Sequence, residues 1–319
     1  MNTEKVPLII AHRGASGYLP EHTLQAKTLA HEMGADYLEQ DVVATRDDEL
    51  VVLHDIYLDR VSDVATRFPG RARDDGRYYV RDFDLSEIRE LHAWERMQAD
   101  GTAVYPGRYP ARSGQFGMHT LREEIELVQR LNRESGREAG IYPEIKRPAW
   151  HRDQGVDIAP VMLELLLSCG YSARSDAVFV QCFDAAEVRR LRHELHYPWR
   201  LVQLIGENSW QEAATDYELL RSTEGLKQLA QHVDAIGPWT QHLYTVQESN
   251  GTRLSSGLTS RAQALGLAVH PYTFRVDELP PGFASFDELV FYFVGELRVD
   301  GLFTDFPDRV RQLLDHSDR

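Results

Sequence analysis

The feature that most constrains the fold is a regular alternation of short apolar runs with amphipathic, helix-like stretches along the chain. Several of these runs lack polar alternation, as strands covered on both faces do. The runs predicted as strands are residues 7–11, 37–43, 50–53, 140–145, 177–183, 200–205, 235–239, 267–274 and 301–306. Such alternation predicts a parallel α/β sheet, and about eight units favour a closed (β/α)8 barrel, the TIM barrel. An open doubly wound sheet is the alternative, but no G-x-G-x-x-G turn follows the first run.

One long connection interrupts the alternation. Residues 55–118 lack clear strand–helix units and carry clusters of Gly, Pro, Arg and Tyr. Segments of this length without regular structure are often functional. We therefore expect one barrel domain over residues 1–319, with residues 55–118 inserted between its second and third units as a wall of the barrel mouth. After the insertion, Thr120 and Glu123 form a capping-box pattern at the start of a helix.

Composition limits the partners and the compartment. Of 319 residues, 35 are Lys or Arg and 50 are Asp or Glu, so the formal net charge is −15. This balance argues against nucleic acid or an anionic membrane surface as the main partner. No apolar run approaches the ~20 residues of a membrane span, and two cysteines cannot form a disulfide framework. No leader precedes the first run, which predicts a cytoplasmic location as the chain stands, or a periplasmic one if a signal peptide was removed.

Acidic residues gather where the first barrel strands end, which is where barrel enzymes place their sites. Glu39 and Asp41 are two positions apart on a strand and therefore face the same side. Glu144 can reach the same space from the neighbouring strand. Three carboxylates in one place repel one another unless a cation lies among them, and these hard oxygen donors favour Ca²⁺ or Mg²⁺. A solvated or Arg-paired rim is the alternative.

Basic residues follow strands at the same rim of the barrel. His12 and His54 each follow a strand beside a charged residue and suit a general acid–base pair. Arg13 and Lys146 add positive charge for phosphate oxygens, although Lys146 could instead pair with Glu144. Cations beside a metal site predict an anionic ligand that also needs a metal, and a phosphate ester is the natural candidate.

Other strand-end residues are expected to complete the pocket. Gln181, Phe183 and Tyr272 are predicted to line it, with packing of the barrel interior as the alternative for Phe183. Asp305, at the end of the last strand, is expected to hold a histidine or an arginine, or to close the barrel rim.

Four sequence blocks resemble the motifs of the glycerophosphodiester phosphodiesterase family. HRGASGYLPEHT at residues 12–23 resembles the opening motif of the family, and GADYLEQDV with LHD at residues 34–42 and 53–55 is similar to its second block. YPEIK and GLFTDFP at residues 142–146 and 301–307 resemble the third and last blocks. The insertion, with YPGRYP at residues 105–110, is similar to that of the bacterial glycerol-metabolism branch, which is often periplasmic.

The resemblance implies a TIM barrel with a bound divalent ion, usually calcium. It implies metal ligands at Glu39, Asp41 and Glu144, an acid–base pair at His12 and His54, phosphate contacts at Arg13 and Lys146, and a further site residue at Glu21. Two positions depart from the family: His22 stands where Asn is common, and Tyr272 stands where the family has a tryptophan.

The activity implied is metal-dependent hydrolysis of glycerophosphodiesters, such as glycerophosphocholine or glycerophosphoethanolamine, to sn-glycerol 3-phosphate and an alcohol. The nucleophile is either the 2-hydroxyl of glycerol, through a cyclic phosphate, or water. The alternatives are a lysophospholipid-cleaving, phospholipase D-type phosphodiesterase and a non-catalytic phosphodiester-binding module. The sequence leaves the oligomeric state open.

Overall fold

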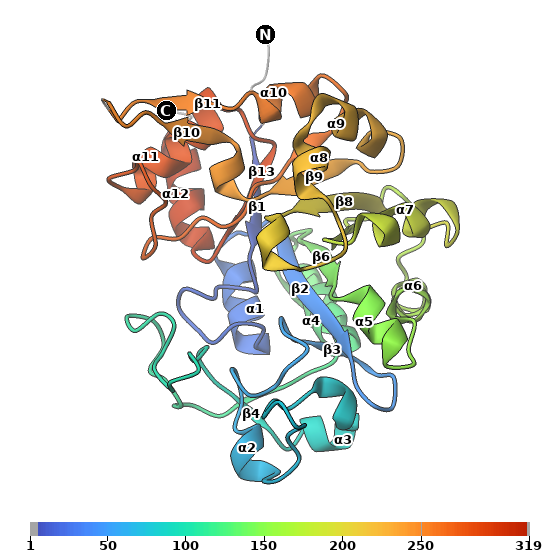
Figure 1. Cartoon of the computed structure of the whole chain (residues 1–319). Helices are drawn as coiled ribbons and strands as arrows, with labels where there is room; N and C mark the ends of the chain where they lie inside the picture. Colours follow the sequence, from blue (N-terminus) through green and yellow to red (C-terminus); the bar gives the residue numbers. More distant parts are fainter. Residues whose placement is uncertain (1–5, 250, 318–319) are drawn as a thin grey trace.

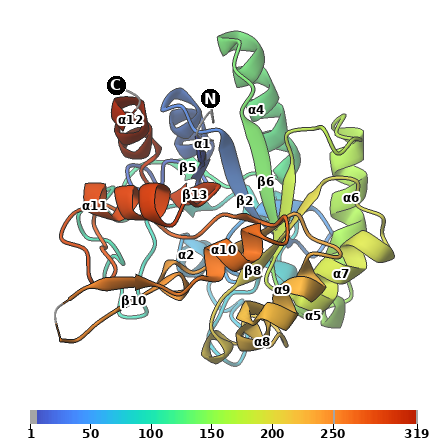
Figure 2. The same cartoon turned by 90° about the horizontal axis from the view of Figure 1, so that it is seen from above.

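The barrel is built from eight of the nine predicted strands, because the run at residues 50–53 forms a strand that pairs antiparallel with its predecessor outside the barrel order. The computed structural model describes residues 6–249 and 251–317. Within them, 8 parallel strands form a nearly closed barrel (Figures 1 and 2). The strands are β1 (Leu8–Ala11), β2 (Tyr37–Ala44), β6 (Gly140–Ile145), β7 (Phe179–Cys182), β8 (Arg200–Ile205), β9 (Ala235–Pro238), β12 (Ala268–Val269) and β13 (Gly301–Thr304), in the order β12-β9-β8-β7-β6-β2-β1-β13. The predicted barrel is confirmed, and the open-sheet alternative is wrong.

Backbone hydrogen bonds join the two ends of this strand order. The N–H of Asp300 donates to the carbonyl of Val269 at 3.0 Å, and the N–H of Phe303 donates to the carbonyl of Pro271 at 3.0 Å. The N–H of Phe274 donates to the carbonyl of Phe303 at 2.8 Å. These bonds satisfy groups that an open sheet would leave unpaired at its edges.

Helices surround the strands on the outside of the barrel (Figure 2). They are α1 (Leu24–Glu32), α4 (Leu121–Ser135), α5 (Pro148–Asp153), α6 (Ile158–Ser168), α7 (Ala185–His193), α8 (Tyr217–Arg221), α9 (Thr223–Leu229), α10 (Leu258–Gln263), α11 (Phe286–Phe291) and α12 (Pro307–Ser317). Short turns lie at η2 (Asn208–Trp210), η3 (Thr240–His242) and η4 (Tyr292–Glu296), and β10 (Tyr244–Val246) pairs with β11 (Arg253–Ser255). The predicted capping box of α4 is present at Thr120 and Glu123. In the described part of the chain, no helix combines the length and the apolar character needed to span a membrane.

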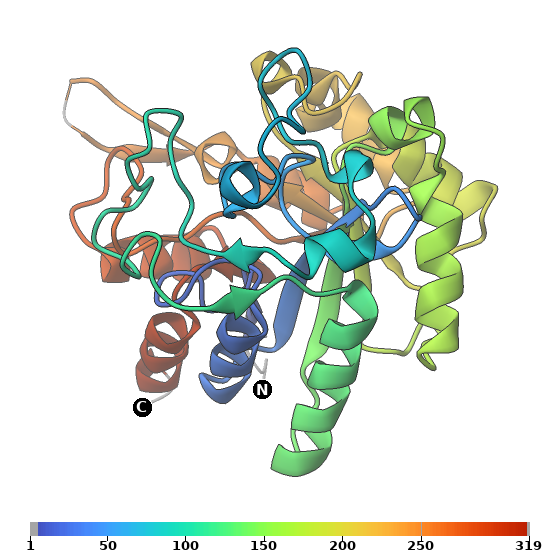
Figure 3. The same cartoon turned by 90° about the horizontal axis from the view of Figure 1, so that it is seen from below.

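The inserted segment begins where β3 (Leu50–Val52) ends, after β3 has paired antiparallel with β2. It contains α2 (Val64–Arg67), η1 (Val80–Asp82), α3 (Leu85–Ile88) and the strand pair β4 (His92–Ala93) and β5 (Phe116–Gly117). Leu58, Val80 and Phe83 of the segment belong to an apolar cluster that they share with Val51 and Leu53. Figure 3 shows the segment, in cyan and teal, on the near side of the barrel strands. The division into one domain with this insertion stays a prediction.

An apolar layer fills the barrel interior near the amino ends of the strands. Its buried members are Ile10, Tyr37, Tyr142, Phe179, Val202, Ala235 and Phe303. The rings of Tyr142 and Phe179 stack with centroids 4.9 Å apart. The layer lies toward the amino ends of the strands, so residues two positions further along each strand lie at the carboxyl ends.

A buried ionic network ties two helices to β2. The side chains of Lys27, on α1, and Glu124, on α4, are both fully buried, and Lys27 Nζ lies 2.8 Å from Glu124 Oε1. His119 Nε2 lies 2.7 Å from the other oxygen of Glu124, and Lys27 Nζ also donates to the backbone carbonyl of Glu39. Burial alone would raise the pKa of Glu124, but Lys27 and His119 lower it to about 2. Breaking such a pair on one side leaves an uncompensated buried charge.

We expect Glu124→Gln to lower the free energy of unfolding by about 3–5 kcal/mol, because Lys27 then keeps a buried charge without its carboxylate. Urea unfolding followed by circular dichroism measures the loss, and the exposed neighbour Glu126 provides the control Glu126→Gln. The folded pKa of Glu124 lies below the unfolded value of ~4.3, so the difference from wild type is full above ~4.3 and shrinks as the pH falls toward the folded pKa. Equal stability of the two variants at neutral pH would contradict this role.

Candidate active site

Polar side chains lie two residues beyond the apolar layer along the strands, on the inner face of the barrel. Side chains alternate along a strand with a period of two, so a residue two positions later points to the same side. The steps from the apolar layer into the site are Ile10 to His12, Tyr37 to Glu39, Tyr142 to Glu144, Phe179 to Gln181 and Phe303 to Asp305. The alternation that builds the interior thus also brings polar groups together at the carboxyl ends of the strands.

Three carboxylates meet at this level. Glu39 and Asp41 belong to β2 and Glu144 to β6, and the strand register pairs Asp41 with Glu144. Each of the three buried side chains offers an oxygen within 4.8 Å of the others. Asp41 Oδ1 is buried without a hydrogen-bond partner. A buried all-oxygen donor set with an unpartnered oxygen fits a hard divalent cation.

The pKa values of the triad show the cost of its like charges. Burial and the charge of Asp41 raise the pKa of Glu39 to about 8. Burial, together with Asp41, also raises the pKa of Glu144 well above its usual range. Burial alone would raise the pKa of Asp41 too, but Lys146 and His22 hold it well below its usual range. A bound cation would favour the ionised form of all three carboxyl groups.

Arg13 places its backbone and its side chain at the triad. Its φ of 59° lies in the left-handed region, and its N–H donates to Glu39 Oε2 at 2.8 Å. Its Nη1 donates to Glu21 at 2.9 Å, and its Nε lies 3.6 Å from Asp41. Gly14 follows with a φ of 90°, and a Cβ there would lie 2.9 Å from the backbone of Ala26. Glycine therefore permits the close turn that presents Arg13.

Three further side chains fix the carboxylates. Lys146 Nζ lies 2.8 Å from Glu144 and 3.9 Å from Asp41. Gln181 donates its Nε2 to Glu39 at 2.9 Å. His22 Nε2 lies 2.7 Å from Asp41 Oδ2. His22, which stands where the resemblance led us to expect Asn, thus contacts a triad member directly.

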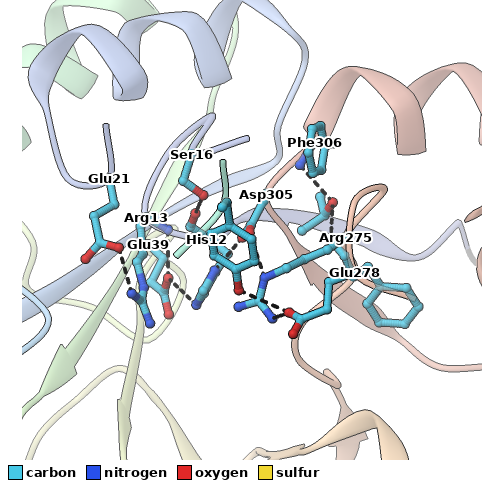
Figure 4. A network of polar contacts seen from close by, with 12 residues as sticks. His12, Arg13, Ser16, Glu21, Glu39, Arg275, Glu278, Asp305 and Phe306 are labelled. Carbon is cyan, nitrogen blue, oxygen red and sulfur yellow. Dashed lines mark hydrogen bonds and ion pairs between the residues drawn. The ribbon is translucent and has the colours of Figure 1, made fainter. Parts of the chain in front are cut away.

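His12 is held by the carboxylate at the end of the last strand. Its Nδ1 lies 2.6 Å from Asp305 Oδ1, and its Nε2 lies 3.9 Å from Glu39. Burial and the nearby Arg13 lower the pKa of His12 to about 4. Asp305 also accepts a hydrogen bond from Arg275, and Figure 4 shows its contacts with both side chains. Asp305 thus holds a histidine and an arginine, as expected.

His54 is held in the same manner by its neighbour in the sequence. Its Nδ1 lies 2.6 Å from Asp55 Oδ1. Burial, with the positive charges of Arg13 and Lys146, lowers the pKa of His54 to about 3. Both imidazoles are therefore neutral at pH 7 in this state. With Nδ1 engaged by a carboxylate, each imidazole has Nε2 left to exchange a proton.

A cavity of about 470 Å³ opens over these groups. Among its lining residues are most of those predicted from the sequence: His12, Arg13, Glu39, Asp41, His54, Glu144, Gln181, Phe183 and Tyr272. Glu21 lines an adjoining cavity of about 160 Å³, together with residues of the inserted segment. Lys146 is not among the lining residues of either cavity, because its ammonium group is directed to Glu144.

Several residues of the site were missed by reading strand ends. Trp210 and Trp239 line the larger cavity with ring centroids 5.2 Å apart. Arg275 lines both cavities, and Arg96 and Arg108 of the inserted segment line the smaller one. These side chains come from loops or from residues just beyond a strand, where periodicity carries no information about direction. The only signal for Arg96 and Arg108 was the abundance of Arg in residues 55–118, and Arg275 directly follows the predicted strand at residues 267–274.

Comparisons with known proteins show the family of the chain. The sequence model of the Glycerophosphoryl diester phosphodiesterase family matches residues 12–309. A glycerophosphodiester phosphodiesterase of Haemophilus influenzae is 40% identical over 97% of this chain and 89% of its own length. One of Treponema pallidum is 35% identical over 94% of this chain and 90% of its own length.

Solved structures share the fold. A putative glycerophosphoryl diester phosphodiesterase from Silicibacter pomeroyi superposes with a TM-score of 0.74 at 23% identity, covering 98% of this chain and 94% of that one. An Oleispira antarctica phosphodiesterase in complex with the product sn-glycerol-3-phosphate gives a TM-score of 0.63 at 20% identity, covering 97% of each chain. With the family model spanning nearly the whole chain and relatives at 35–40% identity, this protein belongs to the glycerophosphoryl diester phosphodiesterase family and is an enzyme of that activity.

Proposed function

We propose that this enzyme hydrolyses glycerophosphodiesters, such as glycerophosphocholine and glycerophosphoethanolamine, to sn-glycerol 3-phosphate and the free alcohol. One observation carries the proposal: an acidic triad, Arg13 and two carboxylate-held imidazoles line the same cavity. The names of the relatives support the reaction class, and the product held by the Oleispira phosphodiesterase supports the glycerol phosphate half of the substrate.

The triad of Glu39, Asp41 and Glu144 would hold Ca²⁺, with Mg²⁺ as the alternative. Calcium accepts irregular sets of carboxylate oxygens, whereas magnesium demands near-octahedral geometry. The bound ion supplies Lewis-acid stabilisation of the negative charge that develops on the phosphoryl oxygens. Arg13 adds a guanidinium for the same oxygens, and Lys146 adds positive charge from behind Glu144.

His12 and His54 act as the acid–base pair. One imidazole takes the proton of the attacking hydroxyl at Nε2, and the other gives a proton from Nε2 to the departing alcohol oxygen. The acid must be protonated first, and the negative charge of the bound diester raises the pKa of the imidazole beside it. The attacking hydroxyl is the 2-hydroxyl of glycerol or water, and either one needs the same base.

The remaining predicted residues shape the pocket. We propose that Phe183 and Tyr272 pack against the glycerol group and that Gln181 keeps Glu39 oriented through their hydrogen bond. Tyr272 is fixed because its hydroxyl donates to the carbonyl of Ile205 at 3.0 Å. Glu21 keeps Arg13 directed at the cavity through their ion pair of 2.9 Å.

We expect Glu39→Gln to weaken calcium binding at least about tenfold, because calcium affinity follows the charge of the ligand set. Isothermal titration of the metal-free protein with CaCl₂ measures the affinity, and circular dichroism checks the fold. The exposed Glu49 offers the matched control Glu49→Gln, which should bind calcium as wild type does. Unchanged affinity in Glu39→Gln would remove Glu39 from the ligand set.

Chelation tests the metal itself. Treatment with EDTA should abolish release of sn-glycerol 3-phosphate from glycerophosphocholine, and added Ca²⁺ should restore it. Restoration by Mg²⁺ but not by Ca²⁺ would assign the site to the alternative ion. Full activity after metal removal, verified by elemental analysis, would end the metal-dependent mechanism.

We expect His54→Gln to lower kcat by about 10²- to 10⁴-fold with little change in KM, because proton transfer matters in the transition state more than in binding. The partly exposed His92, which pairs with Asp63 in the inserted segment, gives the control His92→Gln. A His54 variant that keeps most of its turnover would contradict the acid–base assignment.

A further inference from the structure

The two imidazoles of the site share one supporting arrangement. In each, Nδ1 lies 2.6 Å from one oxygen of an aspartate, Asp305 for His12 and Asp55 for His54. Burial alone would raise the pKa of Asp55, but Arg96 and His54 hold it below its usual range. Arg275 and His12 do the same for the pKa of Asp305 against its burial. An ionised carboxylate can only accept, so Nδ1 carries the proton and Nε2 is left with its lone pair.

The second oxygen of each aspartate accepts a hydrogen bond from an arginine of the inserted segment. Arg96 Nη1 donates to Asp55 Oδ2 at 2.6 Å. Arg108 Nη2 donates to Asp305 Oδ2 at 2.7 Å, across 197 positions of the sequence. The side chains of Arg96 and Arg108 are only 10% and 5% exposed. We call these two sets the His54 relay (Arg96, Asp55, His54) and the His12 relay (Arg108, Asp305, His12).

Each arginine is itself held at several points. Arg108 bonds Asp277 at 2.8 and 3.0 Å, donates to the carbonyl of Ser16, and lies over the ring of Tyr105. Arg96 also bonds Glu21 at 2.9 and 2.6 Å. Because Glu21 bonds Arg13, Arg96 is connected both to His54 and to the arginine proposed to contact the phosphate.

We propose that Arg96 and Arg108 are positioning residues, through which the inserted segment sets the orientation and the tautomer of the two imidazoles. This inference rests on the proposed function and adds a task for the insertion beyond forming a wall of the pocket. A guanidinium that only anchored the segment could bind any buried carboxylate. Arg96 and Arg108 instead bind the two aspartates whose other oxygen holds His54 or His12. The planar fork fixes geometry that a lysine cannot reproduce.

Arg96→Lys and Arg108→Lys test the role while keeping the buried positive charge. With glycerophosphocholine, we expect kcat/KM to fall roughly 10- to 100-fold, the range seen when a supporting contact is lost and a reacting group is misplaced. The loss should be larger in Arg96→Lys, because Asp305 retains Arg275 in the other variant. Thermal midpoints by circular dichroism and calcium binding by titration should stay near wild type.

A change of leaving group separates positioning from a general structural effect. The 4-nitrophenyl diester of glycerol 3-phosphate releases a phenolate that needs no proton. The relay that serves the general acid should therefore lose much less kcat/KM on this substrate, and the relay that serves the base should lose as much as before. Equal losses on both substrates in both variants would overturn the proposal.

Arg73→Lys provides the matched control within the insertion. Arg73 bonds Asp82 and Gln154 and stacks on Tyr79, so its replacement disturbs the segment away from the relays. It should keep wild-type kcat/KM, and a loss equal to that of Arg96→Lys would overturn the positioning role. If wild type itself releases no sn-glycerol 3-phosphate from either substrate, the proposed function fails; if wild type is active and both relay variants match it, only this inference fails.

Histidine nitrogen spectra give a readout independent of turnover. In protein with ¹⁵N-labelled histidine, the signals of His12 and His54, assigned with His12→Gln and His54→Gln, should show the Nδ1–H tautomer. Arg96→Lys should shift the His54 signals and leave those of His12 in place. Unchanged His54 signals, or an Nε2–H tautomer in wild type, would overturn the assignment.

Discussion

The burial of three carboxylates at one point of the barrel interior is the constraint around which the site is organised. Each buried charge costs several kcal/mol unless it is paired. Each carboxylate has a partner of its own. The N–H of Arg13 donates to Glu39, Lys146 pairs with Glu144, and His22 contacts Asp41. From behind the strand, Lys27 binds the backbone carbonyl of Glu39 and is neutralised by Glu124. Groups that look structural therefore set the position and the charge of the proposed metal ligands.

Alternating arginine and carboxylate side chains connect the triad with His54 through a continuous series of contacts. Arg13 bonds Glu21, Glu21 bonds Arg96, Arg96 bonds Asp55, and Asp55 bonds His54. In a buried setting such networks are more rigid than isolated pairs, because each member fixes the next. It follows that the proposed phosphate contact and one member of the proposed acid–base pair do not move independently. The supporting contacts come from a segment outside the barrel, so scaffold and insertion together make the site.

The barrel supplies a generic frame on which this chemistry is placed. The apolar layer of Ile10, Tyr142 and Phe303 belongs to the packing of the fold, and solved structures at 17–23% identity retain that fold with TM-scores of 0.56–0.74. What the residues above the layer do is a matter of their chemistry rather than of the fold. The alternation of strand residues connects the two levels, since a one-residue shift of register would turn both the polar groups and the rings from the barrel interior toward the surrounding helices.

Periodicity in the amino-acid sequence was enough to predict the barrel, its strands and the convergence of Glu39, Asp41 and Glu144, because parallel strands end at one edge of the sheet. The same rule placed His12 at that edge, since it directly follows β1. His54 was placed there by the same reasoning, but it reaches the site because β3 runs antiparallel to β2 and brings the chain back to Asp41, whose carbonyl accepts the N–H of Leu53. Which groups hold these two histidines depends on how the rest of the chain folds around them. Arg108 reaches Asp305 across 197 positions, and Arg96 reaches Glu21 across 75. No local pattern encodes such contacts, because the direction of a long side chain in an irregular segment depends on the packing of the folded chain around it.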